Sequence, residues 1–371
     1  MNLWKISYKD TSDLCVFLMP EKIDIKQISR FRSIEFDFVR CLAIIFVIAG
    51  HFFSLNTEFR TTVFNGELSM VLQGMAKMLF GAGVPLFIIL TGMLNTHKKE
   101  YSWKYIWGMK KVLLAYLLFS IITILFRKYY LLEGESWGQW IMKILNFSAI
   151  PYSWYIEMWI GLYLLTPLLN KCYDAFDGKL LQIRWMLSIL FAITAIPIFT
   201  NRYNMELLPD FWVSCYPVLF FMVGRYIKDG GFGTIKNRWM VVFIVIVCLI
   251  NPIVSYVGIK GHAMLNVAGD HNALLGAPMS IAVFLLIYRC KGVESWNKVV
   301  KWIITRISIL SLDIYLCCFI ADRLVYPFFM DRYFDNQSDF GWFFFIIIPC
   351  VVVISMVIAE VKQLLFKVVR L

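Results

Sequence analysis

Long apolar runs alternate with short polar segments from residue 36 almost to the end of the chain. Most runs contain about 20 residues, the length that an α-helix needs to cross the hydrocarbon core of a bilayer. Because a helix satisfies its own backbone hydrogen bonds in lipid, the pattern predicts an all-α polytopic membrane protein. We expect a bundle of about ten transmembrane helices at residues 36–56, 69–94, 108–126, 153–170, 182–199, 209–227, 239–257, 272–289, 306–328 and 341–361.

The segments between these runs differ in positive charge. Lys and Arg concentrate before the first run, in every second connection after it and in the tail. Segments rich in these residues stay in the cytoplasm, so both termini are predicted to be cytoplasmic, as an even number of helices requires. We therefore divide the chain into a cytoplasmic N-terminal leader, residues 1–35, and a transmembrane domain, residues 36–371.

The composition also indicates a lipid environment. Of the 371 residues, 60% are hydrophobic and only 16% are charged, whereas soluble domains carry about 25% charged residues. The net charge of +11 would suggest nucleic-acid binding in a soluble protein. Here the cations lie in short loops, where they indicate topology, so no nucleic-acid partner is expected. The nine cysteines show no spacing typical of a metal or redox site, so no metal is expected.

The first apolar run carries polar residues on one predicted helix face. They are spaced 3, 11 and 3 positions apart, and at about 100° per residue they form one stripe: Asp37, Arg40, His51 and Ser54. Arg40 and His51 would lie about 16 Å apart along the helix. Charged residues inside a bilayer are costly and usually mark function, although Arg40 alone would also be explained by snorkelling to the headgroups.

Two further runs contain candidate functional residues. Within residues 83–94, Pro85 removes a helix hydrogen bond, and the glycines Gly83 and Gly92 permit close backbone approach. In the fourth run, Glu157 lies about one turn inside the outer end, at a depth similar to that of His51. A contact between these two side chains would fix the imidazole tautomer and make His51 a better general base. Glu157 is therefore a candidate catalytic partner of His51.

These stretches resemble the acyltransferase-3 family. Residues 37–51 are similar to its Arg-x10-His signature with the preceding Asp, and residues 83–94 to its Gly-Val-Pro-Leu-Phe-Phe-x-x-Ser-Gly segment. Residues 154–169 resemble its Trp-Tyr-Leu…Gly-Leu-Tyr-Leu-x-x-Pro-Leu stretch. Residues 220–227 and 311–316 are similar to its Leu-Gly-x-x-hydrophobic and Ser-Leu-Gly-Ile-Tyr-Leu segments. The resemblance spans nearly all the predicted helices and leaves out only the leader.

The sequence departs from the family pattern at three positions. Thr91 stands where the family often has Ser, and Asp313 where it has Gly. Cys318 stands where a His often follows the Ile-Tyr pair. Because that His would be a second titrating group, we assign the chemistry to His51 and leave Asp313 as a buried acid without a role.

The resemblance implies an enzyme that moves an acyl group, most often acetyl, to a hydroxyl of a cell-surface or lipid-linked glycan. The expected donor is cytoplasmic acetyl-CoA, used as a substrate without a permanently bound cofactor, and the expected location is the bacterial cytoplasmic (inner) membrane. Some members carry an extracytoplasmic SGNH domain. Because this chain ends at Leu371, soon after the last run, we expect direct transfer or delivery to a separate extracytoplasmic partner.

CoA is expected to dock from the cytoplasm, with its pantetheine arm extending from Arg40 toward His51. Cationic side chains bind phosphate through charge-assisted hydrogen bonds, and three more lie on the predicted cytoplasmic side, where they also serve as topology signals: Lys110, Lys111 and Arg289. His51 would accept the proton of the acceptor hydroxyl, directly or through an acetyl-histidine intermediate. Candidate donors to the oxyanion are Tyr155 and Tyr315.

Two other functions fit the same residues. An exporter or flippase of a lipid-linked polysaccharide would also use an interior polar stripe, but it would consume no thioester. A structural or assembly subunit would use Arg40 only to lock helices together, through an acid such as Asp37 or Glu360. This second alternative predicts that loss of Arg40 lowers protein abundance and leaves specific activity unchanged.

Overall fold

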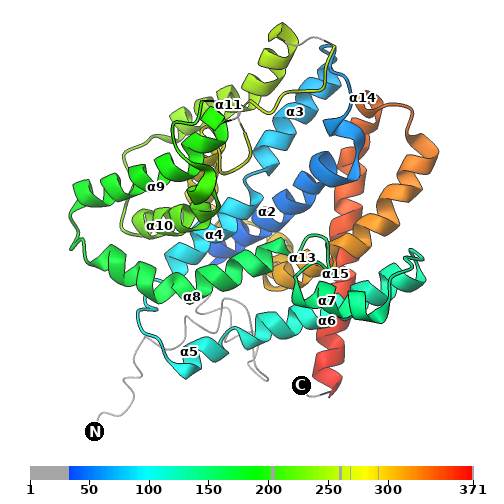
Figure 1. The fold of residues 1–371 in the computed structure, drawn as a ribbon, viewed down its shortest axis with the longest axis horizontal. Coiled ribbons are helices and arrows are strands. Elements are labelled where there is room, and N and C mark those ends of the chain that lie inside the picture. The colour runs from blue at the N-terminus through cyan, green and yellow to red at the C-terminus, as the bar shows by residue number, and fades with distance from the viewer. Residues whose placement is uncertain (1–32, 202–204, 259–260, 268, 291, 370–371) are drawn as a thin grey trace.

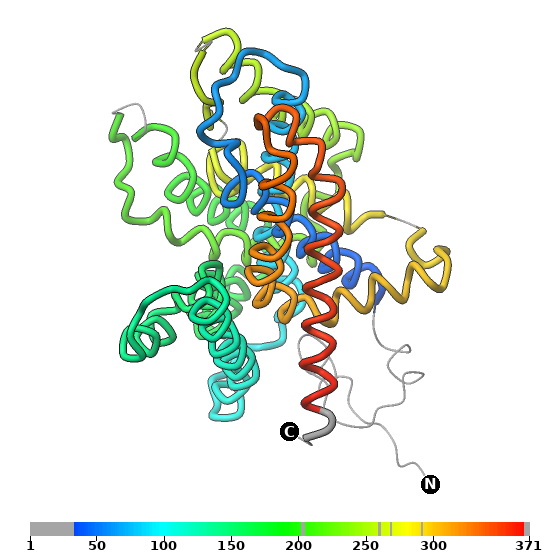
Figure 2. The backbone as a smooth tube through the Cα atoms, turned by 90° about the vertical axis from the view of Figure 1, so that its right-hand side faces the viewer, coloured from blue at the N-terminus to red at the C-terminus, as the bar shows by residue number. Residues whose placement is uncertain are grey.

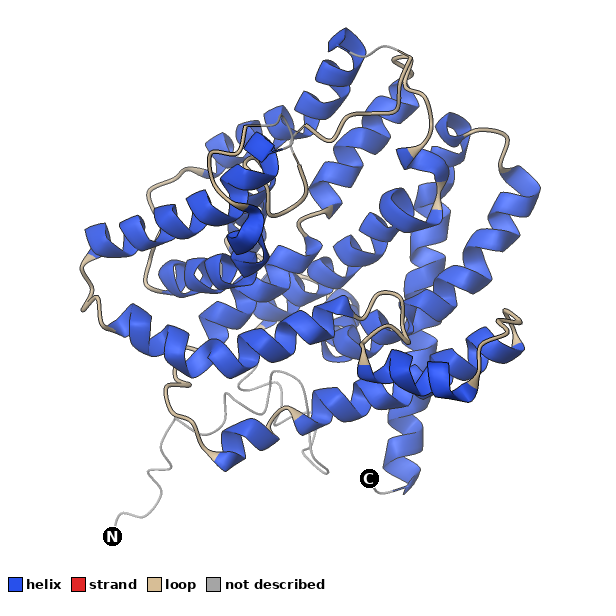
Figure 3. Cartoon of the chain, in the orientation of Figure 1, coloured by secondary structure: helices blue, strands red, loops and turns tan. Residues whose placement is uncertain are grey.

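The computed structural model describes residues 33–201, 205–258, 261–267, 269–290 and 292–369. Within these ranges the fold is helical, and Figure 3 shows helices joined by loops. The predicted all-α fold is confirmed, whereas the predicted leader lies outside the described residues except for positions 33–35. The helices are α2 (Ile34–His51), α3 (Leu68–Phe80), α4 (Gly83–Leu94), α5 (Trp103–Trp107), α6 (Lys110–Tyr129), α7 (Trp137–Leu145), α8 (Trp154–Asp174), α9 (Leu180–Thr200), α10 (Tyr216–Lys228), α11 (Asn237–Gly258), α12 (Gly276–Tyr288), α13 (Lys298–Tyr333), α14 (Gln337–Phe340) and α15 (Phe344–Val369).

Seven helical segments in the described part of the chain are long and apolar enough to cross a membrane. They contain α2, α3 with α4, α6, α9, α11, α13 and α15. The three remaining predicted spans fall on α8, α10 and α12. The last two contain 13 residues each, which corresponds to only about 20 Å of helix. The structure therefore supports a polytopic membrane protein, but it does not confirm the expected number of ten spans.

Helix α13 packs along α2 in the same direction. Near the start of α2, Asp37 accepts a hydrogen bond over 2.7 Å from the Ser308 hydroxyl of α13. Fourteen positions later on each helix, Asp322 lies beside His51. Equal spacing on two helices of equal rise keeps them in register, so the polar stripe predicted on α2 faces α13 at both ends. Figure 1 shows α2 near the middle of the molecule.

Helix α15 runs beside α13 in the opposite direction, as the red and orange helices of Figure 2 show. The guanidinium of Arg306, near the start of α13, forms an ion pair with Glu360 near the end of α15. Asp313, one of the acids without a predicted role, accepts from Lys362 Nζ over 2.7 Å. The start of α2 and the end of α15 therefore lie at the same end of the bundle. That this end is cytoplasmic stays a prediction.

Helices α4 and α10 cross in close contact through two glycines. A Cβ at Gly92 would overlap the backbone carbonyl of Phe221, and a Cβ at Gly224 would overlap that of Ile89. Small residues at such crossings let two helix backbones approach closely. The close approach expected at Gly92 is confirmed. Gly83 serves in the same way, because a Cβ there would meet the backbone of Val47 on α2.

The chain turns between α3 and α4 just before Pro85. Helix α3 ends at Phe80 and α4 begins at Gly83, so Pro85 is the third residue of α4. A proline in the first turn of a helix removes an N–H that has no partner within the helix. The interruption therefore lies at Gly81 and Ala82, and the two helices together form one candidate span of 27 residues.

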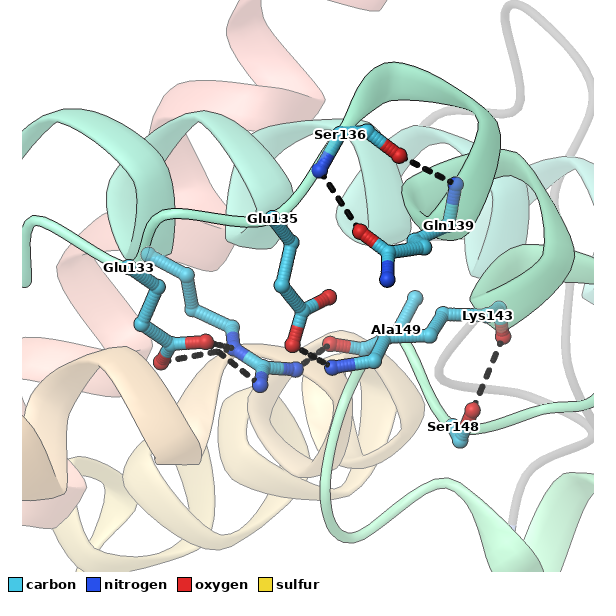
Figure 4. A network of polar contacts seen from close by, with 8 residues as sticks. Glu133, Glu135, Ser136, Gln139, Lys143, Ser148 and Ala149 are labelled. Atoms are coloured by element: carbon cyan, nitrogen blue, oxygen red, sulfur yellow. Dashed lines mark hydrogen bonds and ion pairs between the residues drawn. The ribbon is translucent and has the colours of Figure 1, made fainter.

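The connection after α6 folds back onto that helix as α7. Arg127 at the end of α6 forms a two-pronged ion pair with Glu133, with its Nε and Nη2 at 3.0 and 2.7 Å from the carboxylate (Figure 4). Lys143 pairs with Glu135, and Ser136 caps the start of α7. These contacts hold the long connection as a compact hairpin beside the segment that leads into α8.

Candidate active site

His51 is the last residue of α2, where the chain continues into a π-helix, η1 (Phe52–Asn56). A π-turn winds the chain more widely than an α-turn, and such turns are frequent at functional sites. The His51 side chain is 12% exposed, so protein encloses most of the imidazole. The π-turn brings Asn56 to the same carboxylate that lies beside His51.

This carboxylate belongs to Asp322 of α13, which is 1% exposed. Its Oδ2 lies 3.9 Å from His51 Nδ1. The same oxygen accepts a hydrogen bond from Asn56 Nδ2 at 2.8 Å and another from the Tyr152 hydroxyl at 2.9 Å. A buried carboxylate requires such donors, because burying a charge without partners is costly. The two bonds fix Asp322 in place beside the imidazole.

Tyr152 lies in the turn before α8, and its ring packs against the His51 imidazole with the ring centroids 4.1 Å apart. Burial, together with the nearby charge of Asp322, raises the pKa of Tyr152 above its usual range. Its hydroxyl therefore stays protonated and donates to Asp322. The Tyr152 carbonyl in turn accepts a hydrogen bond from the Tyr315 hydroxyl. Tyr315 thus holds the turn that carries Tyr152.

The arrangement combines an imidazole with a buried carboxylate held by two donors. The distance of 3.9 Å between His51 Nδ1 and Asp322 Oδ2 exceeds that of a direct hydrogen bond. It is short enough for the carboxylate to stabilise a positive charge that develops on the imidazole. In a site shielded from water such stabilisation is stronger than in bulk solvent. The pair is suited to proton abstraction from a weak acid such as a hydroxyl group.

Glu157, the expected partner of His51, does not form that contact. It occupies an exposed position on α8, and the acid that pairs with His51 is Asp322 of α13. Similar depth in two helices does not determine how each helix is rotated about its axis, and Glu157 lies on an exposed face of α8. The predicted pairing is corrected accordingly.

Asp37 and Arg40 meet at the other end of α2. Both are buried, and Arg40 Nη1 lies 3.4 Å from Asp37 Oδ1. Asp37 also accepts from Ser308, so the acid links α2 to α13. Glu360, the other acid considered as a partner of Arg40, pairs with Arg306. The buried ion pair lies about 16 Å from His51 along the helix.

The basic residues expected near CoA phosphate occupy two different settings. Lys110 is exposed and Lys111 is half-buried at the start of α6. Arg289, directly after α12, donates to the carbonyls of Phe232 and Ile235, each over 2.7 Å. Because these carbonyls belong to the connection between α10 and α11, Arg289 holds that connection in place. A role of the three cations in CoA binding stays a prediction.

The two tyrosines expected to donate to the oxyanion differ in their present contacts. The Tyr315 hydroxyl is engaged by the Tyr152 carbonyl, whereas Tyr155 packs its ring against that of Tyr315 with centroids 5.6 Å apart. Cys318, at the position of the family histidine, is fully buried and directs its thiol to the Tyr315 carbonyl. The substitution therefore leaves a small apolar group close to the site.

Sequence reasoning missed Asp322, Asn56 and Tyr152. A signal existed for Asp322, because it is an acid within the apolar run at 306–328 and such residues usually mark function. Asn56 is the last residue of the first run and Tyr152 precedes the fourth, at helix ends where polar residues are common. Only the packing of α2, α8 and α13 brings the three together.

Comparison with known proteins gives one result. The sequence model of the acyltransferase-3 family, described as an acyltransferase domain, matches residues 33–360. The match covers nearly the whole chain and includes every residue of the cluster around His51. No curated protein and no solved structure matches the chain significantly.

Proposed function

Because the chain belongs to the acyltransferase-3 family, we propose that it transfers an acetyl group from cytoplasmic acetyl-CoA to a hydroxyl of a cell-surface or lipid-linked glycan. The proposed location is the bacterial cytoplasmic membrane. The observation that carries the proposal is the buried pair of His51 and Asp322 within the matched domain. An imidazole can accept a proton and return it within one reaction cycle.

In the proposed reaction, His51 removes the proton of the acceptor hydroxyl as the oxygen attacks the thioester carbonyl. A carbon–oxygen bond forms and the carbon–sulfur bond breaks, so CoA leaves as a thiolate and takes the proton back from the imidazolium. Asp322 stabilises the imidazolium between these two steps, as the acid does in other His-acid pairs. General-base catalysis of this kind contributes about 10²–10⁴-fold in rate.

The two substrates would reach His51 from opposite ends of α2. The buried pair of Arg40 and Asp37 lies toward the start of the helix, which is the predicted cytoplasmic end. A donor that enters there must extend a flexible arm over about 16 Å to bring its thioester to His51. The pantetheine arm of CoA is a linear chain of that kind. The acceptor would then approach from the far side of His51.

Transfer of labelled acetyl tests the proposal. Membranes that contain the protein are supplied with labelled acetyl-CoA and with glycan extracted from the cell envelope of the source organism after deletion of the gene. We expect label in the glycan with the wild type and none above background with His51→Ala. His97→Ala is the matched control, because His97 is an exposed histidine outside the helices, and it should transfer normally.

Equal labelling by His51→Ala and the wild type would contradict the proposed role of His51. If wild-type membranes export the glycan and leave acetyl-CoA intact, the chain acts as an exporter and the proposal is wrong. Protein abundance, measured in the same membranes, shows whether each variant is folded and inserted.

A further inference from the structure

Three buried polar atoms at the active site have no hydrogen-bond partner among the described residues. They are Nδ1 of His51, Oδ1 of Asp322 and the hydroxyl of Tyr326. Asp322 and Tyr326 are 1% and 3% exposed. Buried polar atoms in proteins nearly always have partners, and each unpaired one costs about 1–3 kcal/mol. Three such atoms in one cluster indicate a place where a polar ligand binds.

The position of Tyr326 favours one of the two proposed substrates. Tyr326 follows Asp322 by one helical turn, so both side chains lie on the same face of α13. Because α13 runs parallel to α2, this turn lies beyond His51, on the side away from Arg40. The Tyr326 ring packs near that of Phe52, with centroids 5.9 Å apart, which confirms its place after the end of α2. The Tyr326 hydroxyl therefore lies on the side from which the acceptor is proposed to approach, away from the proposed path of the donor.

The distances suit a hydroxyl group. A hydroxyl oxygen about 2.8 Å from His51 Nδ1 would direct its proton to that nitrogen. Asp322 Oδ2, 3.9 Å from the same nitrogen, would stabilise the imidazolium that results. The remaining oxygen, Asp322 Oδ1, accepts hydrogen bonds, while the Tyr326 hydroxyl can both donate and accept. Together these two groups complement a second hydroxyl, which donates to Asp322 and accepts from Tyr326.

We propose that Asp322 and Tyr326, with His51, form the acceptor subsite and bind two neighbouring hydroxyls of a polyhydroxyl compound such as a sugar. One hydroxyl lies at His51 and reacts, and the other is held by Asp322 Oδ1 and Tyr326. This inference rests on the proposed function. It assigns to Tyr326 a role in binding the acceptor and none in binding acetyl-CoA.

Tyr326→Phe removes the hydroxyl and keeps the ring beside Phe52. Initial rates are measured with purified protein in liposomes, once with the extracted envelope glycan varied and once with acetyl-CoA varied. We expect the KM for the glycan to rise about threefold to tenfold, the loss of one hydrogen bond, and the KM for acetyl-CoA to stay at the wild-type value. Tyr333→Phe is the control, because Tyr333 is an exposed tyrosine on the same helix, and it should change neither constant.

An unchanged KM for the glycan in Tyr326→Phe would overturn the inference, as would an equal rise in both constants, which would indicate a general disturbance of the site. Failure of the proposed function gives a different result, because the wild type itself would then transfer no acetyl. The two failures are therefore distinguishable in the same set of measurements.

Discussion

Asp322 is the side chain on which the proposed role of His51 depends most directly. Its Oδ2 atom accepts from Asn56 and Tyr152 and lies 3.9 Å from the imidazole. These donors hold the carboxylate in one orientation inside a buried site. An imidazole next to a fixed negative charge holds a proton better during the reaction than an imidazole alone.

Asp322→Asn should therefore lower kcat and leave the fold intact. The amide has nearly the same shape but carries no charge, so it does not stabilise the imidazolium. We expect kcat to fall by about 10²–10⁴-fold, as in other His-acid pairs that lose the acid, with little change in the KM for acetyl-CoA. The measurement is CoA release by purified protein, with size-exclusion chromatography to verify folding.

Glu157→Gln is the matched control for this prediction. It makes the same chemical change at an exposed acid that does not contact His51, and surface changes of this kind alter free energies by about 0.5 kcal/mol or less. Activity should stay near the wild-type value. If Glu157→Gln lost activity and Asp322→Asn kept it, the original pairing of Glu157 with His51 would be restored and the present assignment would be wrong.

Among the contacts between helices, the crossing of α4 and α10 affects the site most, because α4 also packs against α2 through Gly83. The crossing therefore fixes the position of the helix that carries Arg40 and His51. Gly92 and Gly224 let the two backbones touch, and neither site has room for a side chain.

Gly92→Ala is expected to destabilise the protein by about 1–3 kcal/mol, the usual cost of overpacking. Thermal unfolding in detergent should show a lower Tm than in the wild type. Gly161→Ala on α8 is the control, since no atom lies within 4 Å of a Cβ at that position. There the alanine should leave Tm unchanged or raise it slightly, because alanine favours helix by up to about 1 kcal/mol. Equal Tm values for the two variants would contradict the close crossing.

In the molecule as a whole, the sequence predicted the features that depend on the geometry of one helix alone. The predicted stripe of Asp37, Arg40, His51 and Ser54 follows from helical periodicity. The structure shows Asp37 and His51 both facing α13, whereas Ser54 lies in the π-helix after α2. The close approach at Gly92 followed from residue size. Both predictions hold because the relevant geometry is local.

The contacts between helices could not be predicted from helical periodicity and residue size. Asp322 pairs with His51 because α13 runs parallel to α2 in register, and hydropathy alone says nothing about which helices are neighbours or how they are rotated. For the same reason Asp313 had no predicted role, although the structure pairs it with Lys362 of α15. The short helices α10 and α12 show a further limit, since a run of apolar residues predicts a helix better than it predicts a full span.

We propose that this membrane protein uses His51 to act on a thioester. The most direct test is CoA release from acetyl-CoA by purified protein in liposomes with the envelope glycan present, comparing the wild type with His51→Ala and His97→Ala. We expect the wild type and His97→Ala to release CoA at the same rate, and His51→Ala to fall to background while remaining folded. CoA release by His51→Ala at the wild-type rate would contradict the proposal.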